Sequence, residues 1–518
     1  MKFFGKTRLA GLALAAVMAG APLAAPALAQ EAPAPAAAAP AAEAAPAPAA
    51  EAAAPAAEAA APAAAEAAPA AEAAPAPTPD KGDTTWMLVS TVLVLLMILP
   101  GLALFYGGLC RQKNMLSMLM QVSIVTVIGM MAWAFWGYSL AFTDGGGLNK
   151  FVGGFSKLFL NGAVYNADAA FTNVETFSKD VVIPEVVFVC FQMTFACITA
   201  ALVLGGVAER MKFGAVVVFA LLWPLLSYYP MAHMTWWWAG ATSAFGKTAE
   251  ELVAGAGQIW AFGALDFAGG TVVHINAGIA ALVGALILGP RKGYRSEPMP
   301  PHSLTLTLVG AGLLWVGWFG FNAGSNLEAN GYAGLAMINT LLATAAAGFS
   351  WAMVEWFTRK KASMLGLASG LIAGLVAVTP AAGFAGPVGS IILGLVVSPI
   401  CVIFCSVVKN ALKYDDSLDA FGIHAIGGIV GALATGILVN PAMGGAGVVD
   451  FTNGSVGYDA GVQIMAQVKA VALAVVWSAV ASAIVFFLIK FTLGLRSSPE
   501  AEEEGLDIVE HGERAYHS

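Results

Sequence analysis

The chain has 518 residues, of which 59% are hydrophobic and only 11% are charged, and its formal net charge is -8. Soluble globular domains carry about 25% charged residues, so this composition argues against an ordinary soluble enzyme. Nothing in it suggests a nucleic-acid-binding protein, which would need a basic patch. The first 80 residues hold 13 of the 26 prolines. The rest is almost uniformly apolar and too long for a single anchor, which indicates a polytopic α-helical membrane protein.

Two N-terminal segments stand outside the predicted fold. Residues 1–29 begin with three basic residues, continue with a short apolar run and end in the sequence A-L-A, so we expect a signal peptide with a cleavage site. A first transmembrane helix is the alternative, but the short run and its two prolines disfavour it. Residues 30–80 consist almost entirely of Ala, Pro and Glu. Such a segment cannot bury a core, so we predict a disordered, extended tether.

Residues 81–495 form the predicted membrane domain, followed by a C-terminal tail, residues 496–518. An all-α fold with eleven transmembrane helices is expected, because eleven apolar segments are long enough to cross about 30 Å of hydrocarbon. They are residues 84–108, 115–141, 185–207, 213–232, 258–288, 303–323, 332–357, 363–381, 387–408, 421–440 and 462–490.

The loops between these segments alternate in charge. One set carries fourteen lysines and arginines: Arg111, Lys113, Arg210, Lys212, Arg291, Lys292, Arg295, Arg359, Lys360, Lys361, Lys409, Lys413, Lys490 and Arg496. The other set carries five: Lys81, Lys150, Lys157, Lys179 and Lys247. Basic loops stay in the cytoplasm, so we predict a multi-pass inner-membrane protein with a cytoplasmic C-terminus. An odd number of spans then places the mature N-terminus outside, as a cleaved signal peptide requires.

The fifth and tenth segments resemble each other. The run V-H-I-N-A-G-I-A-A-L-V-G from Val273 is similar to I-H-A-I-G-G-I-V-G-A-L from Ile423, and an acidic residue precedes each histidine, Asp266 and Asp419. Five crossings per repeat is an odd number, so the two halves face opposite ways. We therefore expect an inverted repeat of helices 1–5 and 6–10, with an eleventh helix outside it and a working site between the halves.

Two histidines, His274 and His424, fall inside the repeated helices. A histidine in an apolar span is often only a satisfied structural donor, but a symmetric pair favours a pathway, because ionisable groups are costly inside a membrane. Neutral imidazoles both donate and accept hydrogen bonds and can pass a proton. Asp266 has two compatible interpretations, a helix N-cap and a buried anion that stabilises a nearby cation. For Glu355, a salt bridge to Arg359 at i,i+4 is sufficient.

For the other candidate side chains, a purely structural role is an alternative to a functional one. The phenylalanines Phe191 and Phe195 share one helix face, and their alternatives are lipid-facing or core packing and cation binding on the ring faces. The tryptophans Trp236, Trp237 and Trp238 could be an interfacial belt. Cys401 and Cys405 at i,i+4 could suggest a metal site, but no further ligand joins them. We interpret them as small core residues and expect neither metal nor cofactor.

Five motifs carry a family resemblance. They are L-P-G-L-A-L-F-Y-G-G-L from Leu99, F-Q-M-T-F-A-C-I-T from Phe191, L-D-F-A-G-G-T-V-V-H-I-N from Leu265, G-W-F-G-F-N-A-G-S from Gly317 and D-A-F-G-I-H from Asp419. In this order they resemble the ammonium transporter family (Amt/MEP/Rh), with the bacterial Amt branch nearest. The resemblance runs from about residue 84 to the end. It implies a homotrimer of eleven-helix subunits with one pore through each, ammonium or ammonia as substrate and methylammonium as its analogue.

The resemblance also implies roles for individual residues. Trp236 and Ser325 match the outer ammonium-recruitment site, with Phe191 beside it, and Asp266 matches the acid that the family needs for transport. The pore gate corresponds to Phe195 and Phe321, and the pore lining to His274, His424 and Trp318. The tail matches a cytoplasmic segment that couples to PII-type regulatory proteins. Trp237 and Trp238 stand where small residues are common, and about 30 residues separate Trp236 from Asp266, so the outer vestibule is expected to differ in shape.

Three functions follow as alternatives. The preferred one is a transporter, not an enzyme: it recruits NH4+, deprotonates it and conducts NH3 together with the proton, so that one net charge crosses. The second is an ammonium sensor on the same fold that signals through the tail, against which the absence of a fused signalling domain counts. The third is a neutral NH3 or CO2 gas channel. Trp236 and Ser325 argue against the third, because they suit a cation.

Overall fold

The eleven expected spans have eleven counterparts in the computed structural model. It describes residues 76–164 and 171–516, all within the compact unit Ala74–Ser518. Within these residues ten helices are long and apolar enough to cross a membrane, and Met364–Val378 is an apolar but shorter helix. The predicted signal peptide, residues 1–29, lies outside the described residues, as does the predicted tether up to residue 75.

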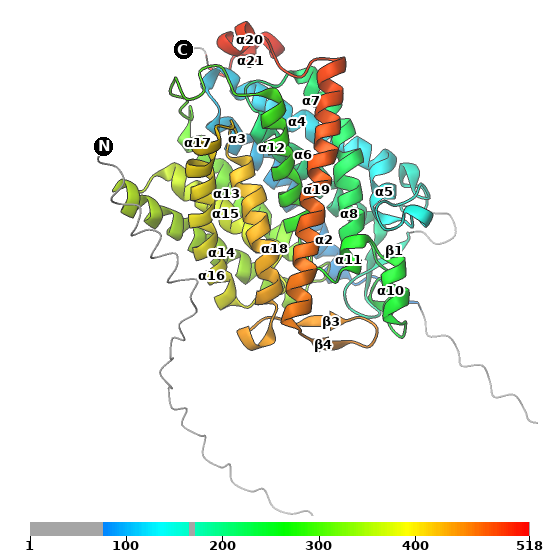
Figure 1. Ribbon diagram of the computed structural model, residues 1–518. Coiled ribbons are helices and arrows are strands. Elements are labelled where there is room, and N and C mark those ends of the chain that lie inside the picture. The colour runs from blue at the N-terminus through cyan, green and yellow to red at the C-terminus, as the bar shows by residue number, and fades with distance from the viewer. Residues whose placement is uncertain (1–75, 165–170, 517–518) are drawn as a thin grey trace, which may run out of the picture. The chain divides into compact units, whose positions relative to one another are not determined.

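Several of the spans are built from more than one helical piece (Figure 1). In chain order the spans are α2 (Lys81–Leu96) with α3 (Ala103–Leu109); α4 (Met115–Ala132) with α5 (Tyr138–Phe142); α6 (Glu185–Val207); α7 (Phe213–Trp223) with α8 (Tyr229–Trp236); α12 (Asn276–Leu288); α13 (Leu304–Gly324); α14 (Gly331–Arg359); α15 (Met364–Val378); α16 (Pro387–Val402) with α17 (Lys409–Leu412); α18 (Ile426–Leu438); and α19 (Ala460–Thr492).

The pieces are joined by π-helical segments: Met97–Leu102, Trp133–Gly137, Pro224–Tyr228 and Ile403–Val408. Proline is present in the first and third, where it removes a backbone donor from the helical ladder. Two further π-helical segments, Gly270–Ile275 and Phe421–Ala425, open the fifth and tenth spans and carry the two histidines. Single π-turns inside helices are frequent at functional sites.

The fifth span starts later than predicted. The expected segment 258–288 is wrong at its beginning, because the short helix α11 (Gln258–Ala261) is separate and the spanning helix begins only at Gly270. Gly263 and Gly269 adopt positive φ angles of 77° and 111°, which end regular helix between the two pieces. Periodicity and hydropathy do not detect such a break, since the intervening residues are themselves apolar.

The two halves of the chain meet in close backbone contact. A Cβ added to Gly278 in α12 would lie 2.3 Å from the backbone nitrogen of Ala425, at the start of the tenth span. Only glycine permits this crossing, because any side chain would separate the two helices. The fifth and tenth spans, which the sequence predicts to be counterparts, therefore pack against each other with their histidines inside.

The two ends of the helices differ (Figure 1). We call one end the C-terminal face, because α20 (Pro499–Glu504) and α21 (Leu506–His511) lie there. The predicted ion pair is present in α14, which ends at Arg359: Arg359 Nη1 lies 3.1 Å from Glu355 Oε1. We call the opposite end the vestibule face. Its short elements include α9 (Ala241–Ala244), α10 (Ala249–Gly255), α11, and the antiparallel pairs β1 (Asn173–Glu175) with β2 (Val182–Pro184) and β3 (Val448–Asp450) with β4 (Ser455–Gly457).

Candidate functional site

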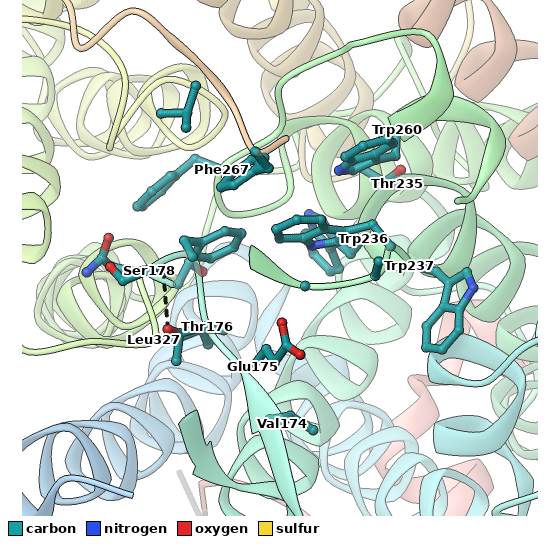
Figure 2. Close-up of a pocket in the computed structure, with 18 of the residues that line it drawn as sticks. Val174, Glu175, Thr176, Ser178, Thr235, Trp236, Trp237, Trp260, Phe267 and Leu327 are labelled. Atoms are coloured by element: carbon teal, nitrogen blue, oxygen red, sulfur yellow. Dashed lines mark hydrogen bonds between the residues drawn. The ribbon is translucent and has the colours of Figure 1, made fainter. Parts of the chain in front are cut away.

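A cavity of about 730 Å³ opens at the vestibule face. Aromatic rings from several elements line it, and Figure 2 shows Trp236, Trp260 and Phe267 among them. The charged residues in its lining are Asp144, Lys157, Glu175, Glu185, Asp266 and Glu328, five acids and one base. Excess negative charge in a concave, partly apolar site raises the local concentration of cations. The cavity is therefore suited to collect a small cation.

Trp236 and Ser325 lie in the lining of this cavity, as the sequence predicts. Trp236 ends α8, and its indole Nε1 donates to the backbone oxygen of Asp266 at 3.0 Å. Ser325 follows α13, and its hydroxyl donates to the backbone oxygen of Phe321 at 2.7 Å. Because that hydroxyl has used its proton, its oxygen remains as an acceptor. An acceptor is what an ammonium ion, which only donates, requires.

Three phenylalanines follow beneath the cavity. Phe195 meets the ring of Trp236 edge-on, with centroids 6.0 Å apart, and stacks on Phe321 at 4.1 Å with an angle of 8° between the rings. Phe191 lies 4.9 Å from Phe195. All three phenylalanines are fully buried. The two residues predicted as the gate, Phe195 and Phe321, are therefore stacked on each other next to Trp236.

The two histidines lie behind this pair of rings. Nδ1 of His274 and Nδ1 of His424 are 3.3 Å apart, and the rings are near parallel, at 5.3 Å and 15°. One Nδ1 must therefore carry a proton that the other accepts. His274 Nε2 is buried and has no protein partner. A pair of this kind can accept a proton at one end and release one at the other.

Trp318 holds the first histidine in place. Its ring stacks on His274 with centroids 5.3 Å apart, and its Nε1 donates to the hydroxyl of Thr379 at 2.9 Å. The predicted pore-lining residue is thus fixed by a partner on the loop after α15, which the sequence does not reveal. Phe321 lies 6.0 Å from the ring of His274. A continuous series of ring contacts leads from Trp236 to His424.

Asp266 is a helix cap, one of its two predicted interpretations. Its carboxylate accepts from four consecutive backbone N–H groups, those of residues 269–272, at 2.6–3.0 Å. Its own carbonyl holds Trp236, so one residue orients both the start of the fifth span and the ring above the gate. The 30-residue separation in sequence is bridged in this way. The second interpretation, a stabilising anion near a bound cation, remains a prediction.

The counterpart of Asp266 in the second half is Asp416, not Asp419. Asp416 precedes His424 by eight residues, as Asp266 precedes His274, and its carboxylate accepts from the N–H groups of residues 420–422 at 2.9–3.2 Å. Asp419 instead pairs with Lys409 at 2.8 Å. Burial raises the pKa of Asp416 to about 6, although the charge of Lys409 opposes this. The equal spacing from the histidines was the signal in the sequence that identifies Asp416.

The additional tryptophans shape the vestibule. Trp237 stacks on His233, whose ring nitrogens contact the backbone oxygens of Ala141 and Asn149. Trp238 lies 4.5 Å from Phe451 and 5.7 Å from Trp260, between α11 and the β3–β4 pair. Trp237, Trp238, Trp260 and Phe451 all line the cavity. The segment between α8 and the fifth span therefore contributes to an aromatic wall that the sequence alone does not place.

The tail is packed on the C-terminal face. The carboxylate of Asp507 accepts from the N–H groups of Leu116 and Ser117 at the start of α4, at 3.1 and 2.8 Å. Nζ of Lys113 donates to the backbone oxygen of Glu502 at 2.8 Å. Glu502 also accepts from Arg496 at 2.9 Å. Hydrogen bonds to the start of α4 and to the residues before it thus hold the tail on the C-terminal face.

Comparisons with known proteins agree on one family. A family model described as the Ammonium Transporter Family matches residues 85–516. Ammonium transporters of Aquifex aeolicus and Bacillus subtilis are each 42% identical to this chain, over 84% of it and over 94% and 98% of their own lengths. Among solved structures, Saccharomyces cerevisiae Mep2 is 32% identical with a TM-score of 0.69, covering 81% of this chain and 91% of its own. A protein described as a sensor Amt protein is 27% identical with a TM-score of 0.71, covering 83% and 98%.

Proposed function

Because the chain belongs to the ammonium transporter family, we propose that it moves ammonium from the vestibule past the stacked phenylalanines and the paired histidines to the C-terminal face. The observation that carries this route is the continuous series of ring contacts from the half-buried Trp236 through the buried Phe195 and Phe321 to His274 and His424. The substrate undergoes no chemical conversion other than proton exchange, so the role is transport and not catalysis.

Recruitment uses the groups at the vestibule floor. Trp236 offers a ring face, worth about 0.5–2 kcal/mol to a cation, and the Ser325 oxygen accepts one N–H of the ion. The acids of the vestibule attract the cation, and Phe191 completes the apolar side. Asp266 keeps Trp236 in position and adds negative charge nearby.

Crossing requires loss of the charge. Moving a bare cation into apolar surroundings costs on the order of tens of kcal/mol, more than two rings and two imidazoles supply. NH4+ therefore releases a proton at the gate, and NH3 passes between Phe195 and Phe321. K+ has no proton to release, so this step discriminates against it despite its similar size.

The histidine pair can carry the released proton. If His274 Nε2 accepts it, the proton on His274 Nδ1 moves to His424 Nδ1, and His424 releases a proton from its Nε2. Atoms and charge balance: NH4+ gives NH3 and H+, both cross, and NH4+ re-forms beyond the pair. The pair is left in the opposite tautomer, which must reset before the next cycle.

The first test measures charge movement directly. Full-length protein in liposomes on a solid-supported membrane receives an ammonium jump, and we expect a saturable current that a K+ jump does not evoke. No current together with ammonium binding that changes the tail would favour a sensor. No current with fast NH3 equilibration would favour a neutral-gas channel.

Replacing both pore histidines tests the relay separately. We expect the His274→Ala, His424→Ala double variant to lose most of the ammonium current, because no other described titratable pair lies next to the gate. His302→Ala is the matched control, since that histidine lies on the C-terminal face beside Cys110 and Tyr516. An undiminished current in the double variant, with K+ still excluded, would remove the relay from the mechanism.

We also propose the arrangement of the chain in the cell. The vestibule opens on the outer side of the inner membrane, and the tail lies in the cytoplasm. The excess of basic residues on the loops of the C-terminal face supports this orientation. Cleavage after residue 29 would leave residues 30–80 as an external tether. The working unit is a homotrimer, and a PII-type protein acts at the C-terminal face, where residues 496–518 contact the ends of the spans.

A further inference from the structure

The loop that follows the second span turns apolar side chains outward. Residues 146–160, here called the aromatic loop, expose Leu148 by 63%, Phe155 by 69% and Phe159 by 73%. Single exposed apolar residues need no explanation, but several large ones on one short loop mark an interaction surface. Ser156 and Lys157 line the vestibule, but the proposed route of ammonium does not use the outward-facing residues of this loop, and the inference below holds whether or not the proposed transport mechanism does.

The lysines of the aromatic loop turn the opposite way. Nζ of Lys150 donates to the backbone oxygens of Val253 and Ala256, and Nζ of Lys157 pairs with the buried carboxylate of Glu185. In water the usual arrangement is the reverse, with ammonium groups outward and rings inward. Here the charged ends contact the protein and the rings face away from it. An apolar medium outside the loop explains this inversion.

The loop also returns alongside the membrane-spanning segment. Its Gly153 N–H donates to the backbone oxygen of Leu140 at 2.7 Å, and the hydroxyl of Ser139 donates to the oxygen of Gly154 at 2.9 Å. A Cβ on Gly153 would lie 2.6 Å from the oxygen of Ser139, so glycine is required for this approach. In Figure 1 this segment lies at the level of α5 and α8, not at that of the β3–β4 pair.

The rings of the loop continue the outer surface of the spans. Phe159 lies 5.6 Å from Phe135, in the π-helical segment after α4. Phe135 continues an exposed stripe of α4 formed by Val127 and Met131, each of the three being 43–49% exposed at intervals of four residues. Phe151 stacks on Trp477, which is in the middle third of α19, at 5.9 Å and 6°. The exposed surface of the helices thus runs without a break into the aromatic loop.

Irregular backbone tolerates an apolar medium only if its polar groups are satisfied. The four consecutive N–H groups of residues 151–154 all donate to protein acceptors. Two of these bonds are accepted within the loop, one on the second span and one on the residue that follows that span. The loop is further fixed by Asn149, whose side chain donates to Gly255 and whose carbonyl contacts His233. It is therefore a fixed shape that presents side chains and not a free strand of backbone.

We propose that the aromatic loop is a lipid-binding surface, immersed in the headgroup and upper acyl region of the outer leaflet. Its occupant is the bilayer itself, because the loop is continuous with the lipid-facing stripe of α4 and keeps its charged groups on the protein side. It anchors the vestibule rim laterally, next to Glu185 and Lys157, which line the cavity. Aromatic side chains are enriched at this depth of membrane proteins.

Nitroxide labels report the surroundings of the loop. Phe155→Cys and Phe159→Cys variants of the full chain are labelled in vesicles of phosphatidylethanolamine and phosphatidylglycerol, with the unmodified chain giving the background from its own cysteines. We expect several-fold higher accessibility to oxygen than to a water-soluble nickel complex. The matched control is Phe245→Cys, 46% exposed on the same face beside the β3–β4 pair, where the order should reverse.

Two results would overturn the proposal. Nickel accessibility equal to or above that of oxygen at positions 155 and 159 would place the loop in water. Low accessibility to both reagents would mean that protein, such as a second copy, covers it. A measurement on the unmodified chain guards against misfolded variants: a membrane-soluble carbene reagent should label the peptide that contains residues 146–160, and absence of that label would also count against it.

Discussion

Asp266→Ala is expected to reduce the ammonium-evoked current at least about a hundredfold while the protein remains in the membrane. The alanine leaves four buried N–H groups, those of residues 269–272, without their carboxylate. Hydrogen bonds to charged groups contribute about 1.5–3 kcal/mol each, so the loss of two shifts the equilibrium away from the native start of the fifth span by about a hundredfold. Local rearrangement would also release Trp236 from the Asp266 carbonyl. The measurement is current per reconstituted protein after an ammonium jump.

Two further variants separate capping from charge. Asp266→Asn keeps an acceptor oxygen and the shape but removes the negative charge; we expect a folded protein that still lacks current. Full current in Asp266→Asn would mean that Asp266 acts only as a cap. Asp459→Ala is the matched control, because Asp459 caps α19 through Val462 in an exposed position and should leave the current unchanged. Undiminished current in Asp266→Ala itself would contradict both roles.

Arg291→Met is expected to destabilise the fold by about 3–5 kcal/mol, which is typical when one partner of a buried ion pair is removed. Arg291 is 8% exposed and binds both carboxylate oxygens of Asp415 at 2.9 Å and Glu209 Oε2 at 3.0 Å. The three residues belong to three different loops of the C-terminal face. Removing the guanidinium leaves the buried carboxylates of Asp415 and Glu209 with less positive charge beside them. Thermal unfolding of the detergent-solubilised protein measures the loss.

The size of this effect should depend on pH. Burial alone would raise the pKa of Glu209, but Arg291 and Arg111 outweigh it and hold that pKa below its usual value. The pKa of Asp415 is also lowered, since Arg291 overcomes the effect of burial. In the native chain both groups therefore contribute stability that is present at neutral pH and lost as the pH falls through their lowered pKa values.

In Arg291→Met the balance changes. Burial then prevails, the carboxyl groups take up protons at higher pH, and the uncompensated charge disappears. The stability difference between the two proteins should accordingly shrink as the pH falls from 7 towards 5. Arg359→Met is the control. The Arg359 side chain, which pairs with Glu355, is 60% exposed, and exposed ion pairs contribute about 0–1 kcal/mol. A difference that is as small as this control, or independent of pH, would contradict the prediction.

The candidate site was largely predictable because its signals are local. A histidine within an apolar span is costly wherever the span packs, so His274 and His424 stand out before any fold is known. The motif around Gly317 indicates Phe321 and Ser325 through the family resemblance. Their spatial relations were not predictable in this way, since Trp236 and Ser325 belong to spans that meet only in the folded protein.

Three features of the structure were not predicted from the sequence. The late start of the fifth span depends on backbone angles at Gly263 and Gly269. The choice of Asp416 over Asp419 depends on which carboxylate faces the free N–H groups of the tenth span. The third feature is the outward orientation of the rings of residues 146–160. It depends on which protein segments contact the loop and on what surrounds its outer side. Hydropathy is insensitive to all three, although the equal spacing of Asp266 and Asp416 from their histidines was a signal for the second.

The sequence by itself determined the membrane class, the number of spans and the pair of histidines, because apolar length and rare polar groups in apolar helices carry large energies at single positions. Five motifs in order determined the family. The tertiary structure alone decided that Trp236, Phe195, Phe321 and the histidines form one line, and that Asp266 joins the helix start to the ring above it. These relations exist because helices from both halves cross in backbone contact. The order of residues along the chain does not show which helices come together.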